Sequence, residues 1–243
     1  MMELTIGAVV IPYEVRESAR TRVMKIVVTP GLVEVVVPVG TPMHGPNSVT
    51  AYVERKRRWV FNAVREIREK HQALLRQQYA SGAKLQYRGR WLMLDVQAGE
   101  VSGVGITCRS KFHVMVPAGL EGGARTEAVR VAFDAWLKER TLETAERLGR
   151  QHERTLGVQA TGYRLSDSKE RWGACGKDGV IRVHWRLAQA PAPALEYVVA
   201  HEVTHLVHRN HSPEFWRALG RTLPDWAERK GMLERWEGER RAV

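Results

Sequence analysis

The chain has 243 residues, of which 44% are hydrophobic and 27% charged, and its formal net charge is +11. This composition is that of a folded globular protein, and it excludes a disordered chain, a collagen-like fibre and a small disulfide-linked scaffold. The excess of basic residues is compatible with an anionic partner such as nucleic acid, but it does not require one.

The chain carries no sign of export or of membrane insertion. Its two cysteines, Cys108 and Cys175, form neither a CxxC pair nor a framework of bridges, which suits a reducing compartment. No stretch approaches the roughly 20 apolar residues of a membrane span, and Glu3 stands where a signal peptide would carry positive charge. We therefore expect a cytoplasmic protein with no membrane partner.

The N-terminal residues predict strands followed by a helix. Residues 22–28 and 32–37 are rich in β-branched side chains and are separated by Pro30-Gly31, which indicates two strands joined by a turn. Asn47-Ser48 offers an N-cap to a helix over 49–79. Apolar side chains recur along it at helical spacing and predict its buried face: Val53, Val60, Val64, Ile67 and Leu74.

Most of the net charge lies in and just after this helix. Residues 55–90 contain eleven Lys and Arg against two acids, Glu66 and Glu69. A solvated helix face is the simpler interpretation, and a surface that binds nucleic acid is the alternative.

The middle of the chain predicts a hairpin over 85–96 with its turn at Arg88-Gly89, then a strand over 111–116. Glycines near 119–123 mark the expected boundary between two parts, a β-rich part with the basic helix at 1–120 and a second part at 121–243.

The second part begins with a helix over 126–156. The alternation of Ile181, Val183, Trp185 and Leu187 predicts a half-buried strand over 180–187, with His184 on its exposed face. The fold class expected is α+β.

A motif with metal-binding spacing follows the breakers Pro191 and Pro193. An apolar helix over 194–208 contains His201, Glu202 and His205 in the pattern HExxH. Positions i and i+4 lie about 40° apart around a helix and about 6 Å apart along it, so both imidazoles can reach one ion. Glu202 adjoins the first ligand without occupying a coordination position, which suits a general base.

A catalytic zinc needs a third protein ligand, and two histidines compete for that role. His208 lies about 10 Å beyond His201 on the same regular helix, too far to join the other two. His211 follows Asn210, a residue that often ends helices, so the chain can turn back toward the ion there. We favour His211 and assign His208 to the helix end or to the support of a ligand.

These residues resemble the YgjP-like metallopeptidase-domain family, which is similar to the SprT and Wss-type proteases. The resemblance rests on four segments: Arg171 to Gly176, the strand Val180 to Leu187, Tyr197 to Leu206 with the HExxH pattern, and Asn210 to Trp216. It implies a zincin-like C-terminal part, with Zn²⁺ held by His201, His205 and His211 and hydrolysis assisted by Glu202. It also makes Arg171, Trp172 and Arg186 candidate substrate-binding residues, although surface arginines and a core tryptophan are the simpler interpretation.

Three functions remain open at this stage. The first is a zinc peptidase that acts on peptide or protein substrates, brought to nucleic acid by residues 55–90, with strand 180–187 as the sheet edge that pairs with substrate. The second directs the same site at the phosphoanhydride bonds of nucleotides. The third is a nucleic-acid-binding module with a structural metal.

Overall fold

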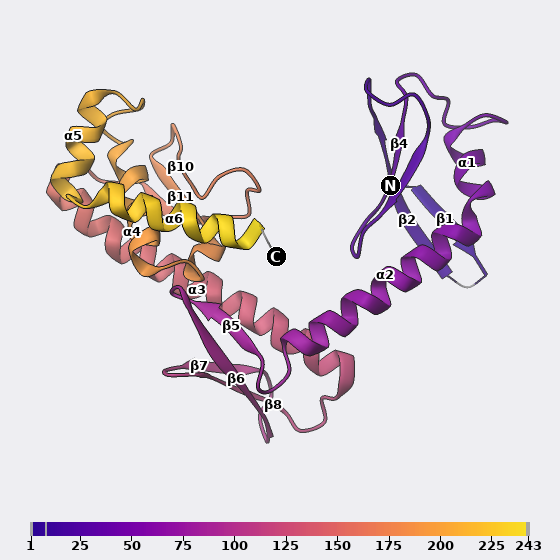
Figure 1. The fold of residues 1–243 in the computed structure, drawn as a ribbon, viewed down its shortest axis with the longest axis horizontal. Helices are drawn as coiled ribbons and strands as arrows, with labels where there is room; N and C mark the ends of the chain where they lie inside the picture. Colours follow the sequence, from indigo (N-terminus) through magenta and orange to yellow (C-terminus); the bar gives the residue numbers. More distant parts are fainter. Residues whose placement is uncertain (1, 8, 242–243) are drawn as a thin grey trace. The chain divides into compact units, whose positions relative to one another are not determined.

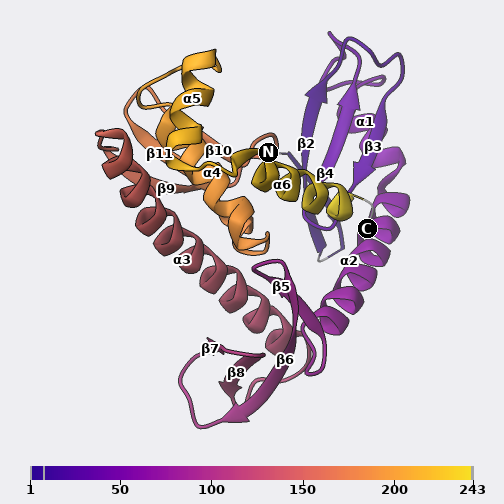
Figure 2. The same ribbon diagram turned by 60° about the vertical axis from the view of Figure 1, so that its left-hand side comes forward.

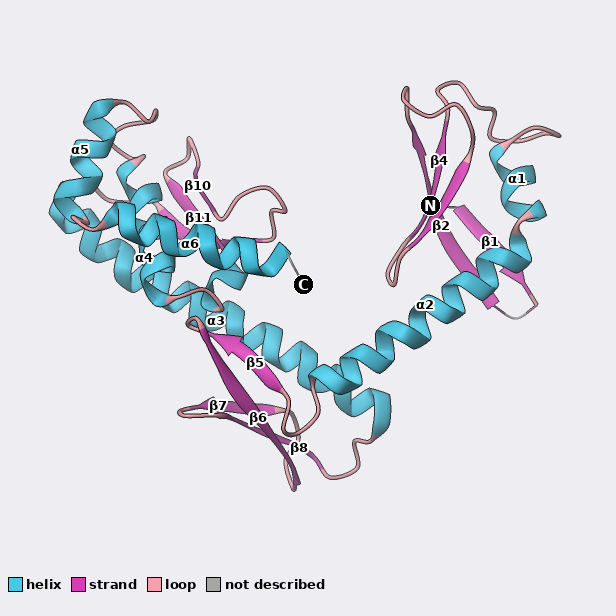
Figure 3. Cartoon of the chain, viewed as in Figure 1, coloured by secondary structure: helices cyan, strands magenta, loops and turns pink. Residues whose placement is uncertain are grey.

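The computed structural model describes residues 2–7 and 9–241 of a mixed α+β protein, with two of its three sheets in the N-terminal half and most helices in the C-terminal half (Figure 3). The chain forms two compact units, Met1–Gln77 and Gln78–Val243. The boundary expected at 120/121 falls inside the second unit, at the loop that precedes its longest helix. Within the described residues, no helix is both long enough and apolar enough to span a membrane.

The first unit is a four-stranded sheet covered by two helices. Its strands are β1 (Met2–Ile6), β2 (Val9–Glu17), β3 (Lys25–Val28) and β4 (Val33–Val37), in the order β1-β2-β4-β3. The turn expected at Pro30-Gly31 is confirmed, because β3 and β4 pair antiparallel on either side of it.

The helix predicted over 49–79 is two helices, α1 (Val49–Arg55) and α2 (Arg57–Gln78), which meet at Lys56. Ser48 caps α1 as expected, since its hydroxyl accepts a hydrogen bond from the Ala51 N–H. Burial on α2 is limited to Val60 and Val64, and Leu74 is 64% exposed. Leu74 was therefore wrongly predicted as buried: the helical period continues beyond the residues that pack in the core with the sheet.

The second unit begins with another four-stranded sheet, made of β5 (Lys84–Tyr87), β6 (Arg90–Gly99), β7 (Gly105–Cys108) and β8 (Phe112–Pro117) in the order β5-β6-β8-β7. The predicted hairpin is confirmed, with Arg88-Gly89 between β5 and β6. The sheet packs against the N-terminal half of the 35-residue helix α3 (Gly122–Leu156), where Phe112 and Phe133 lie in edge contact. Because residues 78–120 share a core with α3, they belong to the same compact unit as the C-terminal half.

A three-stranded sheet and three helices complete the second unit. The strands are β9 (Gly162–Ser166), β10 (Gly173–Cys175) and β11 (Val180–His184), in the order β10-β11-β9. The helices are α4 (Ala192–Thr204), α5 (Pro213–Thr222) and α6 (Trp226–Arg241). Figures 1 and 2 both show α4 beside α3, and α4 also contacts α6 and the strands β10 and β11. Burial on several sides explains why α4 is almost entirely apolar.

Two expectations about strand 180–187 are wrong. The strand ends at His184, and Trp185–Ala188 form a short 3₁₀ helix, so the alternation of buried side chains continues past the end of the strand. β11 is also the central strand of its sheet, whereas β10 and β9 form the edges. Of the two edge strands, β10 is the one that contacts α4, and one of its two sides pairs with no other strand of the sheet.

Candidate metal centre

Helix α4 carries the first part of the site at its C-terminal end. The helix ends at Thr204, four residues earlier than predicted, and His205 is its C-cap. His205 nevertheless keeps helical backbone angles (φ −66°, ψ −12°), and its N–H donates to the His201 carbonyl. The i, i+4 relation between the two histidines therefore survives the end of the helix.

The three predicted ligands converge. The Nε2 atom of His201 lies 3.2 Å from Nε2 of His205 and 2.9 Å from Nε2 of His211. One nitrogen from each ring lies within 4.8 Å of the other two. Ligand nitrogens around a tetrahedral zinc, with bonds of about 2.0–2.1 Å, are separated by about 3.3 Å. The donor set and its spacing thus fit zinc.

The protonation of these rings also suits metal binding. Burial, together with the charges of His205 and His211, lowers the pKa of the His201 imidazole to about 3. Burial likewise lowers the pKa of His205. Neutral imidazoles are the form that binds a metal ion.

His208 supports a ligand through its backbone. Its carbonyl lies 2.9 Å from Nδ1 of His205, so Nδ1 carries the proton and donates it, which leaves the lone pair on Nε2 facing the other two histidines. The expectation that His208 supports the site from outside the ligand set agrees with this contact.

The segment after α4 returns His211 to the site. The indole N–H of Trp216 donates to the His211 carbonyl at 3.1 Å, and the two rings stack with centroids 5.6 Å apart. The buried ring of Phe215 lies under all three imidazoles, with centroid distances of 4.6–4.9 Å. The sequence analysis did not predict that Phe215 packs against the ligands. Its position on the apolar face of a helix that begins at Pro213 would have indicated that it is buried.

Glu202 points from α4 toward strand β10. It is 7% exposed, and the Cys175 backbone N–H donates to its carboxylate. Burial raises the pKa of Glu202 to about 7, although the Cys175 hydrogen bond and the charge of Arg171 oppose the shift. A carboxyl group with this pKa can both accept and release a proton near neutral pH.

Gly173 is a second residue that sequence reasoning missed. A Cβ built on it would lie 2.6 Å from Oε1 and 2.7 Å from Cγ of Glu202, and 2.8 Å from Cγ1 of Val198. The absence of a side chain at Gly173 therefore allows β10 to approach the Glu202 carboxylate.

The three candidate substrate-binding residues line one cavity, and none of the three predicted metal ligands lines it. Arg171, Trp172 and Arg186 line one cavity of about 370 Å³, which His184 and Arg240 also line. His184 was expected to be exposed and is instead 7% exposed, because it lies at the junction of β11 and the 3₁₀ helix, with its ring edge-on to Trp172. Its Nδ1 accepts the Arg186 N–H at 3.1 Å, so the proton of the neutral ring is on Nε2.

One known protein family matches most of the length of the chain. The family model described as YgjP-like, metallopeptidase domain, matches residues 22–236. No curated protein sequence matches the chain. Among solved structures, similarity is found to the crystal structure of the metallopeptidase zymogen of Pyrococcus abyssi abylysin, at 23% identity and a TM-score of 0.35, covering 39% of this chain and 93% of that chain.

Proposed function

The chain belongs to the YgjP-like metallopeptidase-domain family, and on that premise we propose that it is a zinc-dependent peptidase with a zincin-like second unit. The observation that carries the proposal is the convergence of three imidazoles beside a buried carboxylate. His201, His205 and His211 hold the zinc, and Glu202 is the general base.

A zinc ion held by these three histidines would supply a Lewis acid for the substrate carbonyl and would lower the pKa of a bound water molecule to about 7. Glu202 accepts a proton from the water that attacks the peptide carbonyl, and then delivers this proton to the departing amine. Two features set the position of the carboxylate for both transfers: the hydrogen bond from the Cys175 N–H and the absence of a side chain at Gly173. Phe215 packs against all three imidazoles, and Trp216 packs against those of His201 and His211.

Strand β10 is the edge to which an extended substrate adds. It contacts α4, and it pairs with β11 on one side only. The His184 N–H donates to the Trp172 carbonyl and the Gly176 N–H to the Val180 carbonyl, so the pairing alternates and directs the backbone groups of Gly173 and Cys175 away from β11. The Cys175 N–H is already used by Glu202, so a peptide would pair with the backbone of Gly173 and the Cys175 carbonyl. A peptide on this edge would pass the histidines and Glu202.

The Arg171 cavity gives the substrate a preference for an acidic residue. Four bases line it, Lys169, Arg171, Arg186 and Arg240, against three acids, Asp167, Glu170 and Glu237. The Nε2–H group of the neutral His184 ring adds a hydrogen-bond donor without adding charge. A net charge of +1 matches one carboxylate better than the several charges of a nucleoside triphosphate, which favours a peptide over a nucleotide as the substrate.

The basic residues of α1 and α2 are the proposed contact with nucleic acid. Of the basic residues in α1, α2 and the residue between them, five make no ion pair within the described chain: Arg55, Lys56, Arg58, Arg68 and Arg76. Trp59 is 52% exposed among them and can stack on a base. This contact would deliver the peptidase to protein bound to nucleic acid.

A substrate comparison tests the proposal. Zinc-loaded protein is incubated with unfolded protein chains, with protein bound to DNA and with nucleoside triphosphates, with and without a chelator. We expect chelator-sensitive peptide cleavage. Release of pyrophosphate without peptide cleavage would favour the nucleotide hydrolase, and DNA binding with no hydrolysis of any substrate would favour a binding module with a structural metal.

A further inference from the structure

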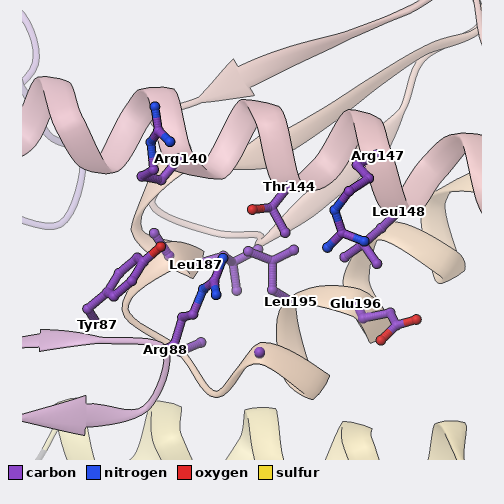
Figure 4. A pocket seen from close by; sticks show the side chains of 12 residues that line it. Tyr87, Arg88, Arg140, Thr144, Arg147, Leu148, Leu187, Leu195 and Glu196 are labelled. Atoms are coloured by element: carbon purple, nitrogen blue, oxygen red, sulfur yellow. The ribbon is translucent and has the colours of Figure 1, made fainter. Parts of the chain in front are cut away.

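A second cavity lies at the other end of α4 from the histidines. Its volume is about 130 Å³, and it lies between the β5–β6 turn, α3 and the first turn of α4 (Figure 4). Ala192 and Glu196, which both line it, precede His201 by nine and five positions, so the cavity lies about 8–14 Å from His201 along the helix. No candidate ligand or substrate-binding residue lines this cavity.

Arg88 enters the cavity from a strained position. Among the described residues other than glycine, it alone has a positive φ, of 49°, and Gly89 follows with φ 75°. Two-residue hairpin turns with positive φ at both positions favour Asn, Asp or Gly at the first, because a longer side chain is strained there. An arginine at this position indicates that its guanidinium has a role.

The surrounding chain fixes the turn. The Arg88 N–H donates to the Ala188 carbonyl at 2.8 Å, and the Gly89 N–H donates to the Gln189 carbonyl at 3.0 Å. A Cβ on Gly89 would lie 3.1 Å from Pro191, so the turn is packed closely against the segment that leads into α4. The Arg88 guanidinium lies over the Tyr87 ring, 5.2 Å from its centroid.

A second guanidinium approaches from α3. In Figure 4 the side chain of Arg88 reaches up from the β5–β6 turn and that of Arg147 reaches down from α3, with Leu195 between them in this view and Thr144 above. In the described part of the chain, neither arginine forms an ion pair with an acid. Two positive charges and a hydroxyl therefore face one small volume.

The other charged groups around the cavity are already neutralised. Glu196 accepts a hydrogen bond of 2.6 Å from Arg229, and Arg140 pairs with Glu139 at 3.0 Å and Glu143 at 2.9 Å. The first turn of α4 adds little to this charge, because Pro193 has no N–H and the N–H groups of Ala194 and Leu195 donate to the Pro191 carbonyl. The uncompensated charge of the cavity is thus that of Arg88 and Arg147.

We propose that this cavity binds a phosphate group. A cavity of about 150 Å³ holds a benzene molecule, so 130 Å³ has room for phosphate. Two guanidinium forks and a hydroxyl from a third direction suit a tetrahedral oxyanion, and a dianion balances the two arginines where a carboxylate would balance one. The site shares no residue with the metal centre and stands independently of the peptidase proposal.

The test is calorimetric titration of zinc-loaded protein with inorganic phosphate, glycerol phosphate and acetate at constant ionic strength. The variants are Arg88→Asn and Arg147→Gln, with Arg154→Gln as the control, because Arg154 lies two turns further along α3 and outside the cavity. We expect the first two variants to bind phosphate at least about tenfold more weakly, and the control to bind it as the wild type does. Arg88→Asn should also leave the Tm unchanged or raise it, because Asn relaxes the turn, so weaker binding cannot be attributed to misfolding.

The three ligands distinguish a phosphate ester from free phosphate, and the variants distinguish this cavity from other binding sites. Tighter binding of glycerol phosphate would identify a phosphate ester as the ligand, and tighter binding of inorganic phosphate would identify the free ion. Equal binding by wild type, Arg88→Asn and Arg147→Gln would place phosphate elsewhere, at the metal centre for example, and overturn the proposal. Absence of binding to the wild type, or acetate binding as tightly as phosphate, would also overturn it.

Discussion

The contact between Gly173 and Glu202 predicts a large effect from a single methyl group. In Gly173→Ala, the new Cβ would lie 2.6 Å from Oε1 of Glu202, whereas ordinary contacts begin near 3.4 Å, so the carboxylate must move by roughly 0.8 Å. Gly173 does not have a positive φ, so the substitution acts through the added atom and not through the backbone. A displacement of about 1 Å in a catalytic group costs on the order of 100-fold in rate, and overpacking costs about 1–3 kcal/mol of stability.

The assay compares kcat for peptide hydrolysis, zinc content and Tm between wild type and Gly173→Ala. We expect kcat to fall by about 100-fold with zinc content unchanged, because Gly173 touches the base and none of the three histidines. Gly162→Ala is the matched control: it lies on β9 of the same sheet, and its Cβ would meet nothing within 4 Å. A Gly173→Ala enzyme as active as the control would refute the role given to the Glu202 position.

Three further predictions follow from charge. Burial lowers the pKa of His152 below its unfolded value of about 6.5. As the pH drops below about 6.5, the unfolded chain therefore binds a proton at this residue before the folded chain does, and the free energy of unfolding falls. The decrease in Tm between pH 7.5 and pH 5.5 should be smaller for His152→Gln than for the wild type. Arg186→Glu should lower kcat/KM for peptides with a glutamate near the cleaved bond by at least about tenfold relative to their glutamine counterparts, and an unchanged ratio would contradict the acidic preference. DNA binding should weaken steeply as the salt concentration rises. In a plot of the logarithm of the binding constant against the logarithm of the salt concentration, the double variant Arg58→Gln and Arg76→Gln should reduce the slope by about 2. Binding that does not depend on salt would contradict the nucleic-acid contact.

Local patterns predicted most of the metal centre. The helical spacing of His201 and His205, with Asn210 as a helix terminator before His211, is sufficient to expect the convergence that the structure has, because each step is a short-range property of the backbone. The same spacing overestimated the helix by four residues, because hydrogen-bonded turns over residues 205–208 continue the period after helix α4 ends at Thr204.

Long-range contacts were beyond local patterns. Nothing in the residues around Gly173 indicates that a carboxylate from another element lies against it, and the alternation over 180–187 does not reveal whether that strand is central or at an edge. The glycines near 119–123 indicated a boundary, but the apolar faces of β5–β8 pack against α3, and this contact sets the compact unit.

Replacement of the proposed general base tests the central claim most directly. Glu202→Gln keeps the size of the side chain and an oxygen that can accept the Cys175 N–H, and it removes the group that accepts a proton. We predict that this variant retains one zinc per chain by metal analysis and loses peptide hydrolysis by at least about 100-fold. Hydrolysis at the wild-type rate with the same zinc content would contradict the assignment of Glu202 as the base.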